Sequence, residues 1–262
     1  MTVTCRSYKF RHAIVREPGN SVVSGLRASR SDDPDPELFK NEHRIYVQSL
    51  EANGLDVTLL PPLEDFPDAV FVEDAAICTG KTAVLLRPGA PSRRDEVVAI
   101  KPALVDVFEQ LIDLPGDGLV DGGDVLLTEN DAFIGLSERT NQTGFEALSS
   151  VLSTLGYRSR KVETPSDILH FKTDCGLLDA ETIFATRRLA RTRCFDGYQV
   201  MLAPDGEEAA ANLIRVNDVV LISAGYPMTK SVLTKAGYEV QAIPTSQAAL
   251  IDGGPSCMSL RF

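Results

Sequence analysis

Cys257 lies in the sequence context that points most directly to chemistry. In its segment, IDGGPSCMSLRF (251–262), Gly253 and Gly254 allow the backbone to approach a ligand closely, and Pro255 stiffens the turn. A thiol attacks as the thiolate, so a catalytic cysteine needs cationic or dipolar neighbours and partial exposure. The apolar residues that follow predict a strand, which would place the nucleophile at a turn-to-strand junction. The alternative interpretation is an inert buried cysteine.

A general base that works near neutral pH would come from one of three histidines, His12, His43 and His170. The sequence predicts His12 in a first strand and His43 in a charged helix start. His170 lies in the apolar segment ILHFKT, where an imidazole is either a satisfied core residue or a working one. We therefore take His170 as the candidate base, with a structural histidine as the alternative.

Four carboxylates occur in apolar contexts typical of strands: Asp68, Glu73, Asp74 and Asp121. They are placed to hold a cation, and a guanidinium presents a planar fork of N–H donors that two carboxylates can clamp. Asp121 could instead accept a hydrogen bond from His170 and fix its tautomer, as the third member of a triad does. Turns and caps are the structural alternative for the Asp-Gly-Gly sequence of VDGGD.

Arginines in loop-like segments could bind the carboxylate of a substrate through bidentate hydrogen bonds. They are Arg93 and Arg94 in APSRRDE and Arg139 in SERTN. Each of them taken alone is typical of a solvated surface charge.

Motifs for cofactors and metals do not occur in the sequence. There is no Walker or dinucleotide glycine fingerprint, and the five cysteines include no C-x-x-C pair and no histidine spacing of a zinc site. We predict no cofactor, no metal site and no disulfide framework. The cysteines other than Cys257 are interpreted as ordinary thiols: Cys5, Cys78, Cys175 and Cys194.

The composition describes a chain that can bury a large core, with 44% hydrophobic and 24% charged residues among 262. The N-terminal segment carries charges where a signal peptide would be apolar, and no run of about 18 apolar residues occurs, so we expect a cytoplasmic protein. The formal net charge of −11 argues against nucleic acid and anionic membranes as partners. It favours a cationic small-molecule substrate, although solubility alone also accounts for such a charge.

Three segments share a pattern of helix, glycine, strand and proline. Apolar residues at helical spacing end at Gly54, Gly156 and Gly237, and alternating β-branched residues follow each glycine. The pattern predicts left-handed C-caps at these three glycines. Units that carry Asp74, His170 and Cys257 come next, and the segments 119–127 and 211–222 look like the corresponding strands of two more units.

Starting points near 71, 119, 169, 211 and 250 imply about five repeated units in one domain that spans residues 1–262. A closed ring of α/β modules would bring equivalent strand ends together near its axis, so that Asp74, His170 and Cys257 could meet. An ordinary α/β sheet of similar units is the alternative. The polar segment 29–43 predicts a surface loop that enters a helix at about Pro36, and the preceding segment 19–29 is a candidate lid or a plain surface loop.

Six motifs in order resemble the dimethylarginine dimethylaminohydrolases over nearly the whole chain: FPDAVFVEDAAIC, RPGAPSRRDE, LVDGGDVL, IGLSERTNQTG, LHFKT and IDGGPSCMSLRF. The resemblance implies a five-bladed α/β propeller, the pentein fold of guanidino-modifying enzymes, built from ββαβ modules.

The resemblance also implies roles for individual residues. Cys257 would be the nucleophile, His170 the general acid and base, and Asp121 the residue that orients His170. Since some bacterial relatives carry Glu at this position, the shorter Asp121 would need a slight backbone or water adjustment. The implied substrate contacts are Asp74 and Glu73 for the guanidinium, Arg93 and Arg139 for the α-carboxylate, Asp68 with the backbone of Ile251 for the α-amino end, and Leu26 as the leucine of a mobile loop.

The implied reaction is hydrolysis of Nω-methylated L-arginine to citrulline and an alkylamine through a covalent thiouronium on Cys257. It needs no metal, although a thiolate beside an imidazole can bind Zn²⁺ as an inhibitor. Two alternatives stay open: a hydrolase of another guanidino compound, similar to arginine deiminase, and a non-catalytic propeller that binds a cationic amino acid or a protein. The sequence leaves the oligomeric state open, a homodimer included.

Overall fold

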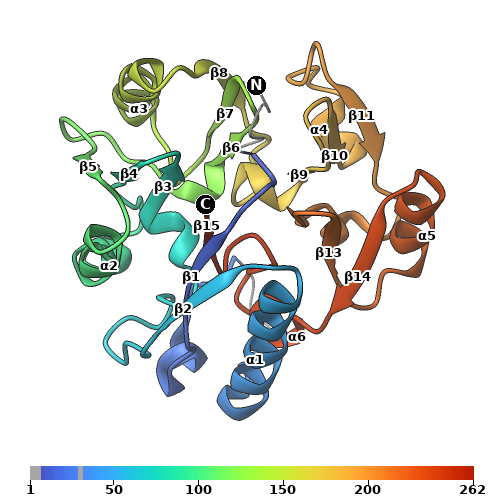
Figure 1. Ribbon diagram of the computed structural model, residues 1–262, viewed down its shortest axis with the longest axis horizontal. Helices are drawn as coiled ribbons and strands as arrows, with labels where there is room; N and C mark the ends of the chain where they lie inside the picture. Colours follow the sequence, from blue (N-terminus) through green and yellow to red (C-terminus); the bar gives the residue numbers. More distant parts are fainter. Residues whose placement is uncertain (1–6, 29–31) are drawn as a thin grey trace.

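The computed structural model describes residues 7–28 and 32–262, which form five three-stranded sheets arranged as a ring around one axis (Figure 1). Cys5 and residues 29–31 of the predicted loop lie outside the described residues. The strands are β1 (His12–Arg16), β2 (Asp56–Leu60), β3 (Ala76–Thr79), β4 (Thr82–Leu85), β5 (Gln110–Asp113), β6 (Val125–Leu127), β7 (Asp131–Leu136), β8 (Arg158–Glu163), β9 (Cys175–Leu177), β10 (Thr182–Ala185), β11 (Gln199–Leu202), β12 (Ile214–Val216), β13 (Val219–Ser223), β14 (Glu239–Ile243) and β15 (Leu260–Arg261).

Six α-helices and six short 3₁₀ helices connect these strands in the described part of the chain. The α-helices are α1 (Pro36–Ala52), α2 (Glu96–Val105), α3 (Gln142–Thr154), α4 (Arg187–Ala190), α5 (Pro227–Lys235) and α6 (Ser246–Ala249). The 3₁₀ helices are η1 (Asn20–Ser24), η2 (Val72–Ala75), η3 (Pro91–Arg93), η4 (Gly122–Asp124), η5 (Phe171–Thr173) and η6 (Glu208–Ala211).

All five sheets have the same topology, which confirms the predicted five-bladed α/β propeller. In each, a middle strand pairs antiparallel with one neighbour and parallel with the other, as β4 does with β3 and β5. The parallel pair requires a crossover, and a helix supplies it, α2 in this blade. The middle strands are buried along their length, whereas outer strands such as β5 and β11 are mostly exposed. The blades therefore stand with one edge toward the axis and the other toward solvent.

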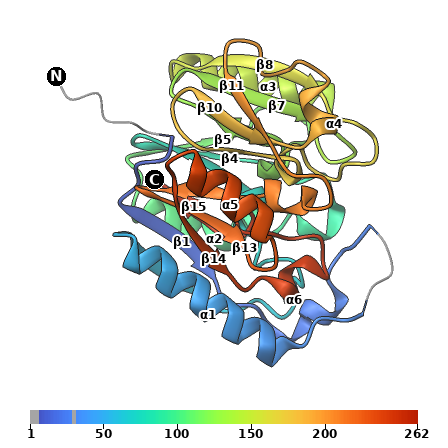
Figure 2. The same ribbon diagram turned by 90° about the vertical axis from the view of Figure 1, so that its right-hand side faces the viewer.

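The ring closes through a sheet that joins distant parts of the chain. β15 pairs antiparallel with β1, with Ala13 opposite Arg261, and β1 pairs parallel with β2. The predicted starting points near 71, 119, 169, 211 and 250 fall just ahead of β3, β6, β9, β12 and β15. Figure 2 shows that the chain enters β1 and leaves β15 on one side of the ring, while α6 lies toward the other side.

Local signals in the sequence set where several helices begin and end. α1 begins at Pro36 as predicted, and the Asp35 side chain caps it by accepting hydrogen bonds from the N–H groups of Glu37 and Leu38. The glycines at the ends of the three predicted helices have left-handed backbone conformations, with φ of 89° at Gly54, 85° at Gly156 and 96° at Gly237. A residue with a Cβ is strained there, so the predicted C-caps are confirmed.

The hydrophobic core is divided among the spaces between neighbouring blades. One cluster packs Leu148 and Leu152 of α3 against Val84 of β4 and Ile134 of β7, and it therefore joins two blades. Since each blade shares its apolar faces with its neighbours, no blade buries its faces alone.

The predicted strand contexts of several candidate residues are wrong. Glu73 and Asp74 lie in the 3₁₀ helix η2, and Asp121 lies at the N-cap of η4. Apolar neighbours suggested strands because these inner turns are surrounded by protein, and a short buried turn is apolar in the same way as a short buried strand. His43 is also not at a charged helix start, since it lies inside α1 and is buried.

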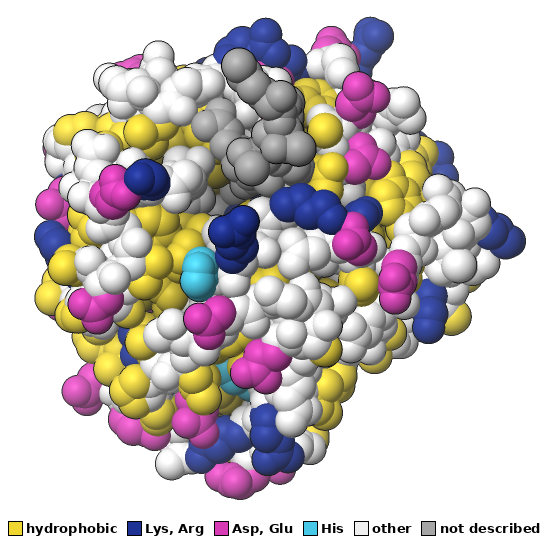
Figure 3. Space-filling view, viewed as in Figure 1, with side chains coloured by type: hydrophobic (Ala, Val, Ile, Leu, Met, Phe, Trp, Pro, Cys, Tyr) yellow, Lys and Arg dark blue, Asp and Glu magenta, His cyan; other side chains and the backbone are white. Residues whose placement is uncertain are grey.

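Charged side chains of both signs are spread over the face seen along the axis, with apolar side chains between them (Figure 3). Among the described residues, no helix combines the length and the apolar composition needed to cross a membrane. The four described cysteines are free thiols: Cys78, Cys175, Cys194 and Cys257.

Candidate active site

Every blade places a turn ahead of its inner strand, and these turns carry the candidate residues. η2, η4, η5 and η6 precede β3, β6, β9 and β12, and the turns of 251–257 precede β15. Asp74 lies in η2, Asp121 and His170 are the N-caps of η4 and η5, Asn212 follows η6, and Cys257 closes the series. Repetition of one module therefore brings reactive side chains from distant parts of the sequence to one end of the ring.

Eight of the ten predicted site residues line a single pocket of about 210 Å³. They are Leu26, Asp68, Asp74, Arg93, Arg139, His170, Ile251 and Cys257. The other two, Glu73 and Asp121, are buried next to the pocket and contact its walls. The predicted meeting of Asp74, His170 and Cys257 is thus found in the structure.

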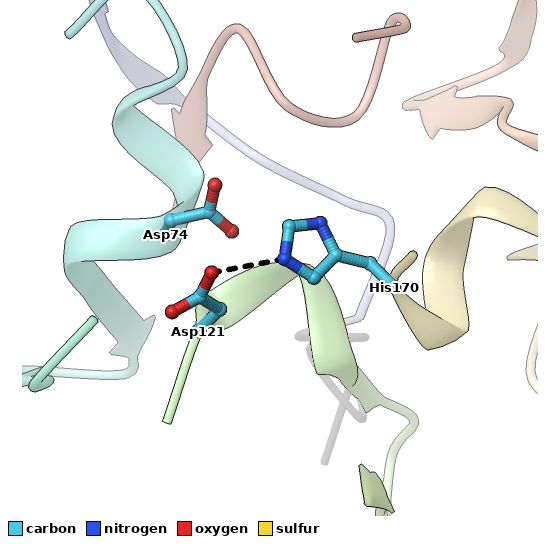
Figure 4. Close-up of side chains that lie close together, drawn as sticks. All are labelled: Asp74, Asp121 and His170. Atoms are coloured by element: carbon cyan, nitrogen blue, oxygen red, sulfur yellow. Dashed lines mark hydrogen bonds and ion pairs between the residues drawn. The ribbon is translucent and has the colours of Figure 1, made fainter. Parts of the chain in front are cut away.

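His170 and Asp121 form a direct pair, with Nε2 2.9 Å from Oδ2 (Figure 4). Asp121 is fully buried, and its Oδ1 accepts a hydrogen bond of 2.7 Å from the N–H of Gly89. The predicted backbone or water adjustment for the shorter carboxylate is therefore unnecessary, because η4 brings Asp121 into direct contact. Asp124, the second aspartate of VDGGD, accepts from the N–H of Phe171 at 2.8 Å and so holds the turn that carries His170.

Carboxylates around His170 favour its charged form. Burial acts to lower the pKa of the imidazole, but Asp74, the hydrogen bond to Asp121, and Asp124 outweigh it and raise the pKa to about 9. His170 is therefore an imidazolium at neutral pH.

Arg93 is not the solvated loop arginine that its sequence context suggested. It is buried in η3, pairs with Asp74 and Glu96, and donates through Nη2 to the carbonyls of Asp68 and Phe71. The PSRRDE sequence contains one partner, Glu96, but the others come from η2 and from the turns before it, so the sequence gave no sign that Arg93 is buried. One Nη1–H of Arg93 has no partner among the described residues, and Arg93 lines the pocket.

Asp74 is held in its charged form by the groups that surround it. Burial acts to raise its pKa, but Arg93 and His170 outweigh burial and lower the pKa to about 2. Its Oδ1 accepts from the N–H of Gly123 at 2.8 Å. A Cβ on Gly123 would lie 2.7 Å from His170 Nδ1 and 2.9 Å from Asp74 Oδ1, so glycine is needed for this close approach.

Glu73 is fixed by two cations on one of its oxygens. Its Oε1 lies 2.6 Å from Lys172 Nζ and 3.4 Å from Arg261 Nη2. Its Oε2 is buried and has no hydrogen-bond partner within the described chain. A buried, unpaired carboxylate oxygen is suited to accept from a bound cation, and the backbone N–H of Glu73 donates to the Cys257 carbonyl at 3.1 Å.

Cys257 is half-buried, and the protein groups around it disfavour the thiolate. Burial, together with the charges of Glu73 and Asp74, raises the pKa of the thiol to about 11, against the opposing effect of the Gly254 and Ser256 hydrogen bonds. The cysteine is therefore a neutral thiol at neutral pH.

The pocket also carries groups suited to an amino acid. The carboxylate of Asp68 is buried, and its Oδ1 accepts from the N–H of Leu26 at 2.9 Å. The Asp252 side chain accepts from the N–H of Ala28, so two carboxylates hold the segment 26–28, which lines the pocket. Arg139 is half-buried and also lines the pocket.

Among the described residues, Asp74, Asp121 and His170 form a group that could hold a metal ion, since their donor atoms lie within 4.8 Å of one another. Their oxygens are already used by Arg93, by His170 and by the N–H groups of Gly123 and Gly89. An ion would have to displace a buried arginine, so this donor set does not fit a metal site.

Sequence reasoning missed four residues that contact the candidate site residues or the turns that carry them: Asp124, Lys172, Asn212 and Ser256. Asn212 lies in ANLIRVND, which was interpreted as a strand. The repeat could have identified Asn212, because each of the other units has a reactive residue just ahead of its inner strand.

A five-bladed α/β propeller whose inner turns bring a cysteine, a histidine and carboxylates into one pocket defines the pentein class of guanidino-modifying proteins. The family described as "N,N dimethylarginine dimethylhydrolase, eukaryotic" matches residues 27–171. The chain belongs to the dimethylarginine dimethylaminohydrolase family. It is 37% identical over 254 residues to the N(G),N(G)-dimethylarginine dimethylaminohydrolase of Pseudomonas aeruginosa, which covers 97% of this chain and 100% of that protein.

Solved structures of this family superpose closely on the chain. A cysteine-to-serine variant from Pseudomonas aeruginosa, complexed with citrulline, has a TM-score of 0.94 and 36% identity, covering 97% of this chain and 100% of that one. A histidine-to-glycine variant, solved as an adduct with S-methyl-L-thiocitrulline, has a TM-score of 0.93 with the same identity and coverage.

Proposed function

We propose that this protein hydrolyses Nω-methylated L-arginine to L-citrulline and an alkylamine, with Cys257 as the nucleophile. The observation that carries the proposal is one pocket in which the Cys257 thiol, the His170–Asp121 pair and the Asp74 carboxylate meet. The family membership and the citrulline bound to a relative support the same reaction class.

The pocket suggests how the substrate lies. The guanidinium would sit between Asp74 and the unpaired Oε2 of Glu73, where negative charge is concentrated. The α-carboxylate would contact Arg139 and the remaining Nη1–H of Arg93, and the α-amino end would contact Asp68 and the backbone of Ile251. Leu26, at the entrance, would cover the bound molecule.

Binding of the cation would activate the nucleophile. Glu73 and Asp74 contribute to the raised pKa of the Cys257 thiol, and a guanidinium bound between them would offset both charges. The thiol then loses its proton to solvent beside the carbon that it attacks. A substrate without positive charge would leave Cys257 protonated, so charge selects the substrate as well as shape does.

In the first half of the reaction, the Cys257 sulfur forms a bond to the central guanidinium carbon and gives a tetrahedral adduct. The His170 imidazolium then donates its proton to the methylated nitrogen. The C–N bond breaks, neutral dimethylamine or methylamine leaves, and a cationic thiouronium stays on the sulfur.

In the second half, His170 is neutral and accepts a proton from water as the hydroxide adds to the thiouronium carbon. The C–S bond then breaks, the hydroxyl proton passes to solvent, and citrulline forms together with the thiolate. Asp121 keeps the ring in place through both transfers by holding Nε2.

We also infer that residues 1–262 act as one domain. The described residues form five sheets of one topology, and β15 pairs with β1 although the two strands lie more than two hundred residues apart in the sequence.

Purified protein is expected to release citrulline from asymmetric dimethylarginine and from monomethylarginine faster than from arginine. Cys257→Ser should abolish release because serine lacks a usable nucleophile there. Cys194→Ser is the matched control, since Cys194 is a half-buried thiol that lies outside the pocket, and it should keep the activity of the parent.

Citrulline is measured for each substrate and variant, with thermal melting to show that the variants are folded. Turnover by Cys257→Ser would refute the mechanism. A preference for unmethylated arginine would favour the deiminase-like alternative, and binding without turnover would favour a non-catalytic propeller.

A further inference from the structure

Asn212 occupies in the fourth blade the place that reactive residues occupy in the others. It follows η6 directly and precedes β12, as Asp74 precedes β3 and His170 precedes β9. Asn212 is buried, with 7% of its surface exposed. The repeat of the fold thus predicts that a fifth side chain reaches the reactive end of the ring.

The amide of Asn212 contacts the nucleophile directly. Its Nδ2 lies 3.7 Å from the Sγ of Cys257, within the range of a hydrogen bond to sulfur. Its Oδ1 accepts from the N–H of Ser256 at 3.0 Å. Because the oxygen is used by a backbone donor, the orientation of the amide is fixed and the Nδ2 hydrogens face the sulfur.

The turn that carries Cys257 is shaped to admit this side chain. A Cβ on Gly254 would lie 2.7 Å from Cγ and 2.8 Å from Oδ1 of Asn212, too close for any residue but glycine. The carbonyl of the same glycine accepts from the N–H of Cys257 at 3.2 Å. Gly254, the second glycine of IDGGPSC, therefore leaves room for the Asn212 side chain and also accepts a hydrogen bond from Cys257.

A neutral donor suits the charge requirements of this pocket. The attacking sulfur must become negative close to Glu73 and Asp74, which repel that charge. A lysine or arginine beside the sulfur would stabilise the thiolate, but it would also repel the guanidinium that has to approach the same atom. An amide N–H stabilises the thiolate without adding positive charge.

We propose that Asn212 is a catalytic residue that donates a hydrogen bond from Nδ2 to the Cys257 sulfur, stabilising the thiolate as it forms and aiming it at the guanidinium carbon. The inference rests on the proposed function for the identity of the reaction, but the contact with the sulfur can be tested without turnover.

Asn212→Asp is the sharpest variant, because it keeps the acceptor for Ser256 and the shape while it replaces the donor with a negative oxygen. Asn212→Ala removes the donor without adding charge and serves as the second variant if the first one does not fold. Asn41→Asp, on the exposed surface of α1, is the control with the same charge change.

Two measurements decide the proposal: kcat and KM for asymmetric dimethylarginine, and the rate of Cys257 alkylation by iodoacetamide as a function of pH. Cys257→Ser identifies the part of the alkylation that belongs to this thiol. For Asn212→Asp we expect kcat to fall about tenfold or more while KM changes much less. We also expect the alkylation profile to move to higher pH by about one unit or more, with a smaller shift in Asn212→Ala and none in Asn41→Asp.

An alkylation profile that stays at the parent pH in folded Asn212→Asp or Asn212→Ala would overturn the proposal, as would a kcat within about twofold of the parent. If the parent itself forms no citrulline, the proposed reaction fails, and the shift of the alkylation profile still decides whether Asn212 bonds to the sulfur.

Discussion

Four buried charges hold one another in place in and beside the pocket. The His170 imidazolium lies between the carboxylates of Asp121 and Asp74, and Arg93 balances Asp74 from the other side. Removing one member would leave an uncompensated buried charge. His170, which we propose as the catalytic acid and base, therefore also helps to stabilise the fold around it.

The contribution of His170 to stability should depend on pH. Its folded pKa is about 9, above the ordinary 6.5, so the unfolded chain releases this proton more readily. The stabilisation is fully present below pH 6.5 and is lost as the pH rises through 9, a change of up to about 3 kcal/mol. We expect His170→Asn to differ from the parent most at pH 6 and least at pH 10, by urea unfolding.

His12→Asn removes an exposed histidine outside the pocket and should show no comparable change. An equal loss of stability in His170→Asn at both pH values would mean that His170 is not charged in the folded protein.

At the scale of elements, α1 carries a buried group that nothing in the reaction uses. His43 lies inside this helix next to Tyr46, and its Nε2 has no hydrogen-bond partner among the described residues. Burial lowers the pKa of His43 to about 4. The helix therefore holds a neutral imidazole at a pH where the unfolded chain would hold a charged one.

Acid should weaken the protein partly through His43. As the pH falls from 6.5 to 4, the unfolded chain binds a proton that the folded chain does not, which costs up to about 3 kcal/mol. We expect His43→Leu to lose less stability than the parent between pH 7 and pH 4.5, as measured by urea unfolding. Parallel losses in the two proteins would show that His43 already takes up its proton in the folded state.

Sequence patterns predicted those parts of the fold that depend on neighbours along the chain. The glycines at 54, 156 and 237 were correctly predicted as C-caps because a left-handed residue has a local cause. The inner turns were misassigned as strands because neighbouring blades bury them. Arg93 was misassigned as a surface residue because Asp68, Phe71 and Asp74, which bind it, lie 19 to 25 residues earlier in the chain. Asn212 was not predicted as a site residue, because its contacts with Ser256 and Cys257 join positions more than 40 residues apart.

At the scale of the molecule, closure of the ring depends on a very short strand. β15 contains only Leu260 and Arg261, and Leu260 packs into a cluster with Ile14 and Leu104. The pairing of β15 with β1 links this strand to the blade that contains α1. Since neighbouring blades share their cores, a fault at this seam should weaken the whole ring.

Leu260→Ala should therefore destabilise the protein by about 2–5 kcal/mol, because it leaves a cavity at the seam. We expect loss of activity and loss of secondary structure to occur together on heating, at a lower temperature than in the parent. Val98→Ala is the control, since Val98 on α2 is 70% exposed, and it should melt like the parent. Activity that disappears well before the secondary structure would show that the blades unfold separately.

The position of the nucleophile beside this seam has a consequence for biosynthesis. Cys257 precedes β15 by three residues, while β1, the partner of β15, leaves the ribosome more than two hundred residues earlier. A nascent chain that ends at β14 already contains His170 and the carboxylates of the site, but it lacks both Cys257 and β15. The proposed hydrolysis therefore has to wait until β15 completes the sheet of β1 and β2, and we expect a chain that stops at β14 to be inactive.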